Sequence, residues 1–213
     1  MGEWPVLDNH DSRIRYFPLL LERELGDVPH AELPEGFRFA FYQDGDREAW
    51  MDIEKSAKEF SSREEGLRAW NRYYGGHEPE LAGRMLFITD SRNVKVATAT
   101  AYYDVTGRDG PETGWLHWVA VRRGHQGKGL SKPLISRALA IFKEWGYTHV
   151  KIPTQTATWL ACKIYLDFGF LPEAQNAVDR VDGWRIIKRL TGHPALSRFD
   201  AAKKDEVFRH PER

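Results

Sequence analysis

The stretch from residue 115 to residue 146 constrains the fold more than any other part of the chain. The run "WLHWVAV" (115–121) is apolar on both faces, which is typical of a central strand. A turn rich in glycine and positive charge follows, "RRGHQGKGLSKP" (122–133). Apolar residues then recur at helical spacing until Gly146. A buried strand that leads directly into an amphipathic helix predicts an α/β (or α+β) domain around one mixed sheet.

The rest of the pattern agrees with this fold class. Alternating or aromatic runs predict strands at 37–43, 84–90, 94–105, 148–156 and 183–190. Capped amphipathic runs predict helices within 44–60, 61–76 and 158–169, and a short helix within "FPLLLERELG" (17–26). We expect an N-terminal arm (1–35), one domain (36–190), and a charged tail (191–213) that is solvated or loosely helical.

Composition excludes several classes of function. The chain of 213 residues has 31 basic and 31 acidic residues, so no net field draws it to nucleic acid or to an anionic membrane. Its single cysteine, Cys162, excludes an internal disulfide and a zinc site built on paired thiolates. Apolar runs are shorter than the roughly 18 residues of a membrane span, and the N-terminus does not resemble a signal peptide. We therefore expect a soluble, cytoplasmic protein without a metal.

The glycine-rich turn fits neither common phosphate-binding loop. Leu130 stands where a Walker A loop has its lysine, and Lys132 stands where a dinucleotide fingerprint has its third glycine. What remains is a basic turn that opens onto a helix N-terminus, an arrangement that binds a pyrophosphate. From composition alone, a solvated loop whose glycines serve only the turn is an equally good interpretation.

Two segments together resemble the GNAT superfamily of acyl-CoA-dependent N-acetyltransferases. The first is "QGKGLS", which matches that family's coenzyme A pyrophosphate motif at the same strand–helix junction. The second is "TWLACKIYLDFGF", in which Thr158 replaces the family's asparagine while Ala161, Tyr165, Gly169 and Phe170 match. The resemblance covers about residues 36–190. It implies a mixed, mostly antiparallel sheet with a splayed central strand pair, flanked by helices, and acetyl-CoA as co-substrate.

The resemblance also implies roles for individual residues. Backbone groups of Val119 and Val121 would pair with the pantetheine arm, and the Val119 amide would stabilise the oxyanion. Tyr165 would protonate the departing thiolate, although packing alone also explains a buried tyrosine. Pro153 suits a strand edge released from its neighbour. The residues expected to bind the co-substrate are Val119, Val121, Gln126, Gly127, Lys128, Gly129, Leu130, Ser131 and Thr158.

The sequence does not decide which residue is the general base. His117 is placed by strand alternation on the face that would also carry Trp115, Val119 and Val121, and its imidazole titrates near neutral pH. A satisfied core histidine is the alternative. The rival carboxylates, which have only positional support, are Asp44, Asp46 and Glu59, and Cys162 is interpreted as a core residue.

The sequence therefore predicts transfer of an acetyl group from acetyl-CoA to a primary amine by direct attack through a tetrahedral intermediate. The amine would belong to a small molecule or to a peptide or protein, and a homodimer remains open. Aromatic residues that could wall the acceptor site are Trp50, Trp70, Tyr73 and Trp115. The alternative is a catalytically weak acyl-CoA-binding or regulatory protein that keeps the fold.

Overall fold

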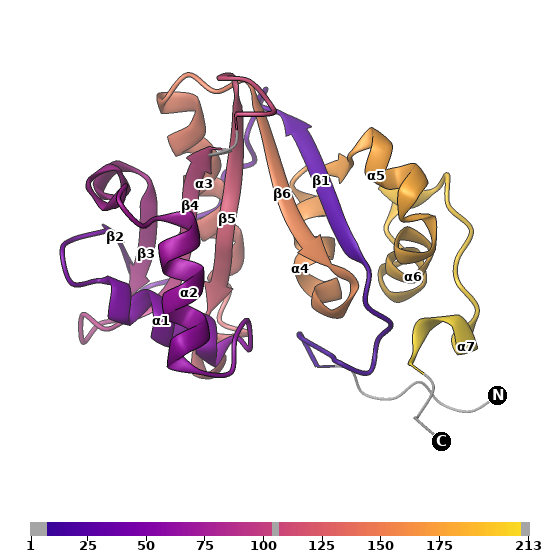
Figure 1. Ribbon diagram of the computed structural model, residues 1–213, viewed down its shortest axis with the longest axis horizontal. Coiled ribbons are helices and arrows are strands. Elements are labelled where there is room, and N and C mark those ends of the chain that lie inside the picture. Colours follow the sequence, from indigo (N-terminus) through magenta and orange to yellow (C-terminus); the bar gives the residue numbers. More distant parts are fainter. Residues whose placement is uncertain (1–7, 104–106, 210–213) are drawn as a thin grey trace. The chain divides into compact units, whose positions relative to one another are not determined.

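The computed structural model describes residues 8–103 and 107–209. These form two compact units, the central unit (Glu24–Lys151) and the terminal unit (Met1–Arg23 with Ile152–Arg213). Figure 1 labels most of the elements. The strands are β1 (Pro18–Glu24), β2 (Arg38–Phe41), β3 (Met85–Thr89), β4 (Lys95–Tyr103), β5 (Thr113–Val121), β6 (His149–Gln155) and β7 (Leu171–Pro172). The α-helices are α1 (Arg47–Ser56), α2 (Arg63–Tyr73), α3 (Ser131–Glu144), α4 (Trp159–Asp167), α5 (Ala174–Asp179), α6 (Val181–Thr191) and α7 (Lys204–Val207).

The central unit is built on an antiparallel meander. Its strands lie in the order β2-β3-β4-β5, each antiparallel to the next. A short hairpin connects β3 to β4, and in it Asn93 adopts a left-handed φ of 63°. The far edge of β5 pairs in parallel with the first residues of β6, over Thr113–Trp115 and His149–Lys151. This mixed, mostly antiparallel sheet confirms the predicted fold class.

Helices cover both faces of the central sheet (Figure 1). On one face α1 and α2 bury an aromatic core that includes Trp50, Trp70, Tyr74 and Tyr102. On the other face α3 comes so close that a Cβ at Gly114 would overlap the ring of Phe142. The start of α2 is capped by Ser62, because the backbone N–H of Glu65 donates to Ser62 Oγ over 3.2 Å.

The terminal unit contains β1 as a strand, so the predicted helix within 17–26 is wrong. In this unit the strand order is β6-β1-β7, and β1 is antiparallel to β7 with Leu21 opposite Pro172. Leu19 and Leu21 are buried on one side, the period-two pattern of a strand. A short isolated helix gains little on its own, and sheet pairing therefore decides the conformation of this apolar segment.

The predicted strand at 183–190 is also wrong, because these residues belong to α6. Trp184 and Ile187 are fully buried one helical turn apart, and the helix ends at Gly192 with a left-handed φ of 63°. The Trp184 indole donates to Asn176 Oδ1 on α5 over 3.1 Å. A Cβ at Gly183 would lie 2.8 Å from Phe17 Cβ, so the glycine that weakens the helical signal permits the close packing.

In the described part of the C-terminal tail (191–209), a few buried side chains anchor the segment to the terminal unit, so it is not solvated throughout. Ala202 and Val207 are 1% and 0% exposed, and they join Ile14 and Ile186 in one buried cluster. An antiparallel bridge joins Ile14 to Phe208. The helical part of the prediction is met by the short α7. Burial of these few apolar side chains holds a segment whose composition is otherwise charged.

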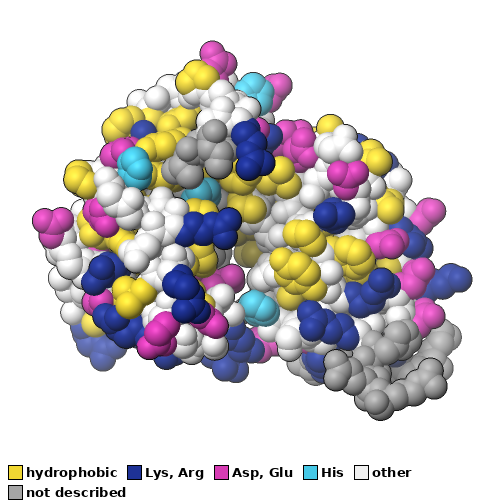
Figure 2. All heavy atoms as spheres, viewed as in Figure 1, with side chains coloured by type: hydrophobic (Ala, Val, Ile, Leu, Met, Phe, Trp, Pro, Cys, Tyr) yellow, Lys and Arg dark blue, Asp and Glu magenta, His cyan; other side chains and the backbone are white. Residues whose placement is uncertain are grey.

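On the face drawn in Figure 2, Lys and Arg side chains are interspersed with Asp and Glu side chains. Within the described ranges, no helix combines the length and the apolar character that crossing a membrane requires.

Candidate functional site

The turn between β5 and α3 requires glycine at two positions. Gly127 and Gly129 adopt φ values of 76° and 78°, in the left-handed region that side chains with a Cβ disfavour. Both are exposed, together with Lys128 between them. Gly124 has no left-handed φ, and a Cβ at that position would have no heavy atom within 4 Å, so the geometry does not require glycine there. The essential glycines are therefore the two of the predicted pyrophosphate motif.

The structure fixes this turn at both ends. The Arg122 N–H donates to the carbonyl of Val96 on β4 over 2.8 Å. The Gln126 side-chain amide donates to the carbonyl of Val121 over 3.1 Å, and Leu130 is 2% exposed where α3 begins. The exposed residues 127–129 are thus held between two anchored points, so their amides are presented in a preorganised loop.

The electrostatics of the turn favour an anion. The first turn of α3 contains no acidic residue, and the N-terminus of a helix carries a partial positive charge. Burial, followed by the charge of Lys128, lowers the pKa of His125, so the cations of the turn are lysine and arginine side chains. Left-handed glycines, exposed residues and local positive charge together fit a pyrophosphate.

A β-bulge interrupts β5 just before this turn. Trp118 has a left-handed φ of 51°, and the register with β4 shifts there, from Thr100 opposite His117 to Thr98 opposite Ala120. Residues opposite each other point to the same face, so Ala120 shares the face of His117. Val121 pairs with Ala97 and lies on the opposite face.

The predicted placement of Val121 on the face of His117 is therefore wrong. Simple alternation fails because the bulge adds one residue to β5. Val119 lies in the bulge and is half-buried. β5 continues to Val121 past the stretch that pairs with β6. Pairing of these backbone groups with a pantetheine arm stays a prediction.

His117 lies within a cluster of aromatic rings. It is 7% exposed, and its ring centroid lies 5.2 Å from that of Tyr73 and 6.0 Å from those of Tyr102 and Trp115. Tyr73 and Trp115, which were predicted to wall an acceptor site, are half-buried beside it. Trp50 and Trp70 are not walls, because at 0% and 1% exposure they belong to the core.

The rival carboxylates differ in what surrounds them. Asp46 accepts the Gln43 N–H over 2.8 Å and pairs with Lys95 over 2.6 Å, so it serves the turn before α1. Asp44 and Glu59 are exposed.

Sequence reasoning missed Glu54, which is fully buried on α1. The signal was present, because Trp50, Glu54 and Ala57 lie at i, i+4 and i+7 of one helix face.

The second family-like segment lies in the terminal unit. Thr158, where the family has asparagine, donates to the carbonyl of Gln155 over 3.0 Å, and its hydroxyl lies 3.0 Å from Thr154 Oγ1. These bonds link the start of α4 to the end of β6. Cys162 is completely buried, and burial raises the pKa of its thiol to about 12. A thiol of this kind suits the core interpretation and not a nucleophile.

Tyr165 is positioned by the end of α4. It is 4% exposed, and its ring makes an edge contact with Phe170 at 6.2 Å between centroids. The helix closes at Gly169 with a left-handed φ of 79°, and the Phe170 N–H donates back to the carbonyl of Tyr165 over 3.1 Å. The Gly-Phe pair of the resemblance therefore has a structural reason. The predicted residues are divided between the units, with Thr158 and Tyr165 in the terminal unit and the others in the central unit.

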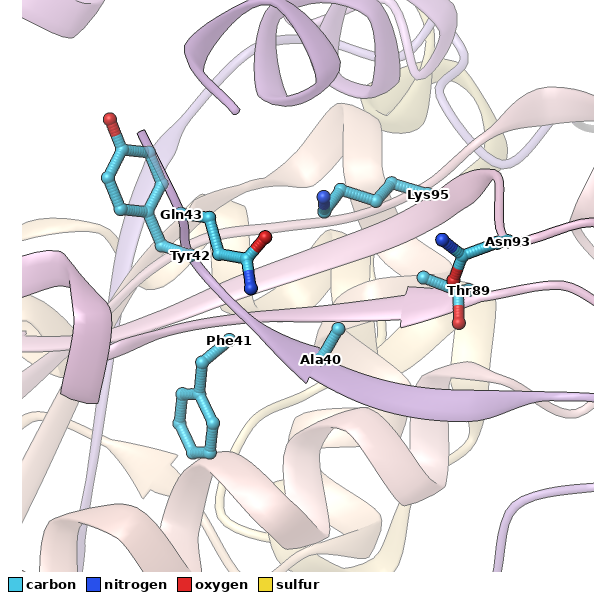
Figure 3. A pocket seen from close by; sticks show the side chains of 7 residues that line it. All are labelled: Ala40, Phe41, Tyr42, Gln43, Thr89, Asn93 and Lys95. Carbon is cyan, nitrogen blue, oxygen red and sulfur yellow. The ribbon is translucent and has the colours of Figure 1, made fainter. Parts of the chain in front are cut away.

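A hollow of about 290 Å³ lies at the β2 edge of the central unit (Figure 3). Its lining contains none of the predicted site residues and consists of Ala40, Phe41, Tyr42, Gln43, Thr89, Asn93 and Lys95. Among the residues that the structure describes, no group of three His, Cys, Asp or Glu side chains is arranged to hold a metal ion.

Comparison with known proteins identifies the family. The family model for the acetyltransferase (GNAT) family matches residues 32–170. No curated protein matches the chain. A GCN5-related N-acetyltransferase from Sphaerobacter thermophilus is similar in structure, with a TM-score of 0.61 and 19% identity over 76% of this chain and 49% of that one. This chain thus spans about half the length of that relative.

Two further solved structures share the fold. A putative GNAT-family acetyltransferase from Novosphingobium aromaticivorans has a TM-score of 0.53 and 18% identity, covering 75% of this chain and 62% of its own. A tandem GNAT protein from the clavulanic acid biosynthesis pathway has a TM-score of 0.54 and 17% identity, and the match covers 76% of this chain and 52% of that one. The matched range, the fold and the strand–turn–helix geometry agree, and the chain belongs to the GNAT family of acetyltransferases.

Proposed function

We propose that this protein is an N-acetyltransferase that moves an acetyl group from acetyl-CoA to a primary amine. The observation that carries the proposal is the β5–α3 turn, where two exposed glycines with left-handed φ values lie just before the positive end of α3. In the proposal this turn, from Gln126 to Ser131, binds the pyrophosphate of the co-substrate. Backbone groups of Val119 and Val121 hold the pantetheine arm, and Thr158 is a further residue that we propose binds the co-substrate.

The reaction that we propose is direct attack of the amine on the thioester carbon. An amine N–H bond breaks as the N–C bond forms, and His117 takes the proton. The Val119 amide stabilises the resulting oxyanion. The C–S bond then breaks, and Tyr165 protonates the thiolate. A phenol with an ordinary pKa of about 10 can protonate a thiolate whose thiol has a pKa of about 8.5 only when it is held close.

The acceptor class follows from the half-buried aromatic side chains near His117. Tyr73 and Trp115 offer flat apolar surfaces that suit the carbon skeleton of a small amine or a peptide side chain. The interspersed surface charges favour neither nucleic acid nor a membrane as partner. A cytoplasmic location and a homodimer stay predictions.

The binding half of the proposal is tested with the Gly129→Asp variant. The new side chain enters a left-handed position, and its charge opposes an anion. We expect calorimetry to show coenzyme A affinity at least ~10-fold weaker than in the unmodified protein. Gly124→Asp is the matched control, because it adds the same charge to the same loop where φ and space allow a side chain. Unchanged affinity in a folded Gly129→Asp variant would remove the basis of the assignment.

The catalytic half is tested by turnover. Free thiol released from acetyl-CoA is measured against a panel of small amines and lysine peptides. We expect at least one amine to be acetylated, and His117→Ala to lower kcat/KM by ~10²-fold and to remove the acidic limb of its pH profile. Coenzyme A binding without turnover of any amine would favour an acyl-CoA-binding or regulatory protein instead.

A further inference from the structure

Trp115, which lies beside the candidate base His117, is held by a carboxyl group from another segment. Its indole Nε1–H donates to Asp109 Oδ2 over 2.8 Å. Asp109 lies in the connection between β4 and β5, with Gly107 before it and Gly110 after it at left-handed φ values of 68° and 76°. These glycines allow the turns by which the carboxyl group reaches β5, so a polar contact as well as packing fixes the Trp115 ring.

The same carboxyl group pairs with a lysine. Asp109 Oδ1 lies 2.6 Å from Lys151 Nζ, and the side chains of the lysine and the aspartate are 18% and 19% exposed. Lys151 is directly opposite Trp115 across β5 and β6, so both side chains lie on one face of the sheet. One oxygen of the carboxylate thus accepts from the indole, and the other pairs with the ammonium group.

This ion pair lies on the face of the sheet that carries the candidate base. Trp115 and His117 are two positions apart on β5, before the bulge at Trp118, and their ring centroids are 6.0 Å apart. At about 3.3 Å per residue, the row that contains Trp115 and Lys151 lies about 7 Å from the row of the histidine. This separation is shorter than the Debye length of about 8 Å at physiological ionic strength, so the lysine charge acts on a ligand bound beside the imidazole.

The aromatic neighbours of His117 cannot neutralise that lysine. Tyr73 on α2 and Tyr102 on β4 meet the imidazole through their rings. Burial raises the pKa of Tyr102 above its usual value, so its phenol stays neutral. Among the residues that the structure describes, Asp109 is the carboxylate that forms an ion pair with Lys151.

An acceptor amine reaches the site as a cation. A primary amine with an ordinary pKa of about 10 is protonated at neutral pH, and it enters the site in that form before it loses a proton. A lysine without its carboxylate partner would repel this cation, because charges in a partly buried site are screened less than charges in water. The carboxylate of Asp109 cancels the lysine charge.

We propose that Asp109 allows the acceptor site to bind cationic amines, because it neutralises Lys151 and fixes the indole of Trp115. The fixed indole is then the wall against which the carbon skeleton of the acceptor packs. Asp109 acts through these two residues, so it is a positioning residue. The inference rests on the proposed function, in which His117 is the base and Trp115 lines the acceptor site.

The first test is Asp109→Asn in the full chain. The amide keeps an oxygen that can accept from the indole, and the substitution removes the charge. KM is measured for the best amine of the panel, and Ki is measured for the alcohol that has a hydroxyl group in place of that amine. We expect KM for the amine to rise ~10-fold and Ki for the uncharged alcohol to change by less than ~2-fold, while KM for acetyl-CoA stays near its original value.

The second test removes the lysine as well. The double variant Asp109→Asn/Lys151→Gln carries neither charge, so KM for the amine should return to within ~2-fold of the original value. Lys151→Gln alone leaves the carboxylate without its partner and should lower KM for the amine, and this variant serves if Asp109→Asn does not fold. Asp46→Asn is the matched control, because Asp46 and Lys95 form an ion pair of the same length, 2.6 Å, at 13% and 21% exposure. It should leave KM for the amine unchanged.

The outcomes separate the two proposals. Equal rises in KM for the amine and in Ki for the alcohol, or no recovery in the double variant, would overturn this inference and leave the acetyltransferase in place. A Lys151→Gln variant whose KM for the amine is at or above the original value would do the same. Failure of the unmodified protein to acetylate any amine would overturn the proposed function, and this inference with it.

Discussion

Glu54 makes the stability of the protein depend on pH in a way that needs no substrate to measure. The ordinary pKa of a glutamate is 4.5, and burial raises that of Glu54 well above this value in the folded protein. Between the two pKa values the folded state binds a proton that the unfolded state has released. The free energy of unfolding therefore decreases as pH rises, by about 1.4 kcal/mol for each pH unit. The stabilisation that this proton contributes is complete below the pKa of Glu54 in the unfolded state. It is lost as pH rises to the pKa of Glu54 in the folded state.

The perturbation is Glu54→Gln, which cannot titrate. The assay is urea unfolding followed by tryptophan fluorescence, repeated from about pH 5 to about pH 8, with the difference in unfolding free energy between the two proteins plotted against pH. We expect the unmodified protein to lose stability relative to the variant as pH rises, with a slope that approaches about 1.4 kcal/mol per pH unit until the pH reaches the folded pKa of Glu54. A slope of this size is readily measured beside a typical domain stability of about 5–15 kcal/mol.

The control is Glu48→Gln on the same helix. Glu48 is half exposed and pairs with Arg63, so its pH dependence should follow that of the unmodified protein. Parallel curves for the unmodified protein and Glu54→Gln would refute the reasoning, because they would mean that Glu54 titrates alike in the folded and unfolded states.

Three further substitutions test other parts of the structure. Gly114→Ala should lower the free energy of unfolding by about 2 kcal/mol or more in urea titrations, because the new methyl group overlaps the ring of Phe142; unchanged stability would contradict this packing. Asp46→Ala should cost about 1 kcal/mol in the same assay, since it removes the ion pair with Lys95 and a backbone hydrogen bond, and no change would mean that neither contributes. Tyr165→Phe should lower kcat and leave KM for acetyl-CoA nearly constant if the hydroxyl protonates the thiolate. An unaltered chemical step in single-turnover kinetics would end the case for Tyr165.

Local chemistry explains what the sequence predicted well. The left-handed positions of Gly127 and Gly129 follow from glycine's lack of a Cβ, and the cap at Ser62 follows from its short polar side chain. The strand, turn and helix between 113 and 144 were likewise predictable, because period-two and period-3.6 patterns arise within a single segment.

Non-local packing explains the errors in secondary structure. The segment of β1 has a helical composition, but pairing with β7 makes it a strand. The segment of α6 has adjacent isoleucines typical of a strand, but its buried residues follow a helical face. In both cases tertiary burial outweighs propensities of a few tenths of a kcal/mol per residue, roughly the range of the intrinsic scales.

The features of the candidate site also separate into local ones, which the sequence predicts, and non-local ones, which it does not. The sequence by itself predicted the glycine turn that we propose binds a pyrophosphate, the candidate base His117 and the helix that contains Tyr165, because each is a pattern of neighbouring residues. Only the tertiary structure decided that the bulge at Trp118 moves Val121 to the other face, and that Glu54 is buried beneath α1. A bulge depends on the register between two strands. The pKa of a carboxyl depends on whether other segments of the chain exclude water from it. Neither property can be read from a single stretch of sequence.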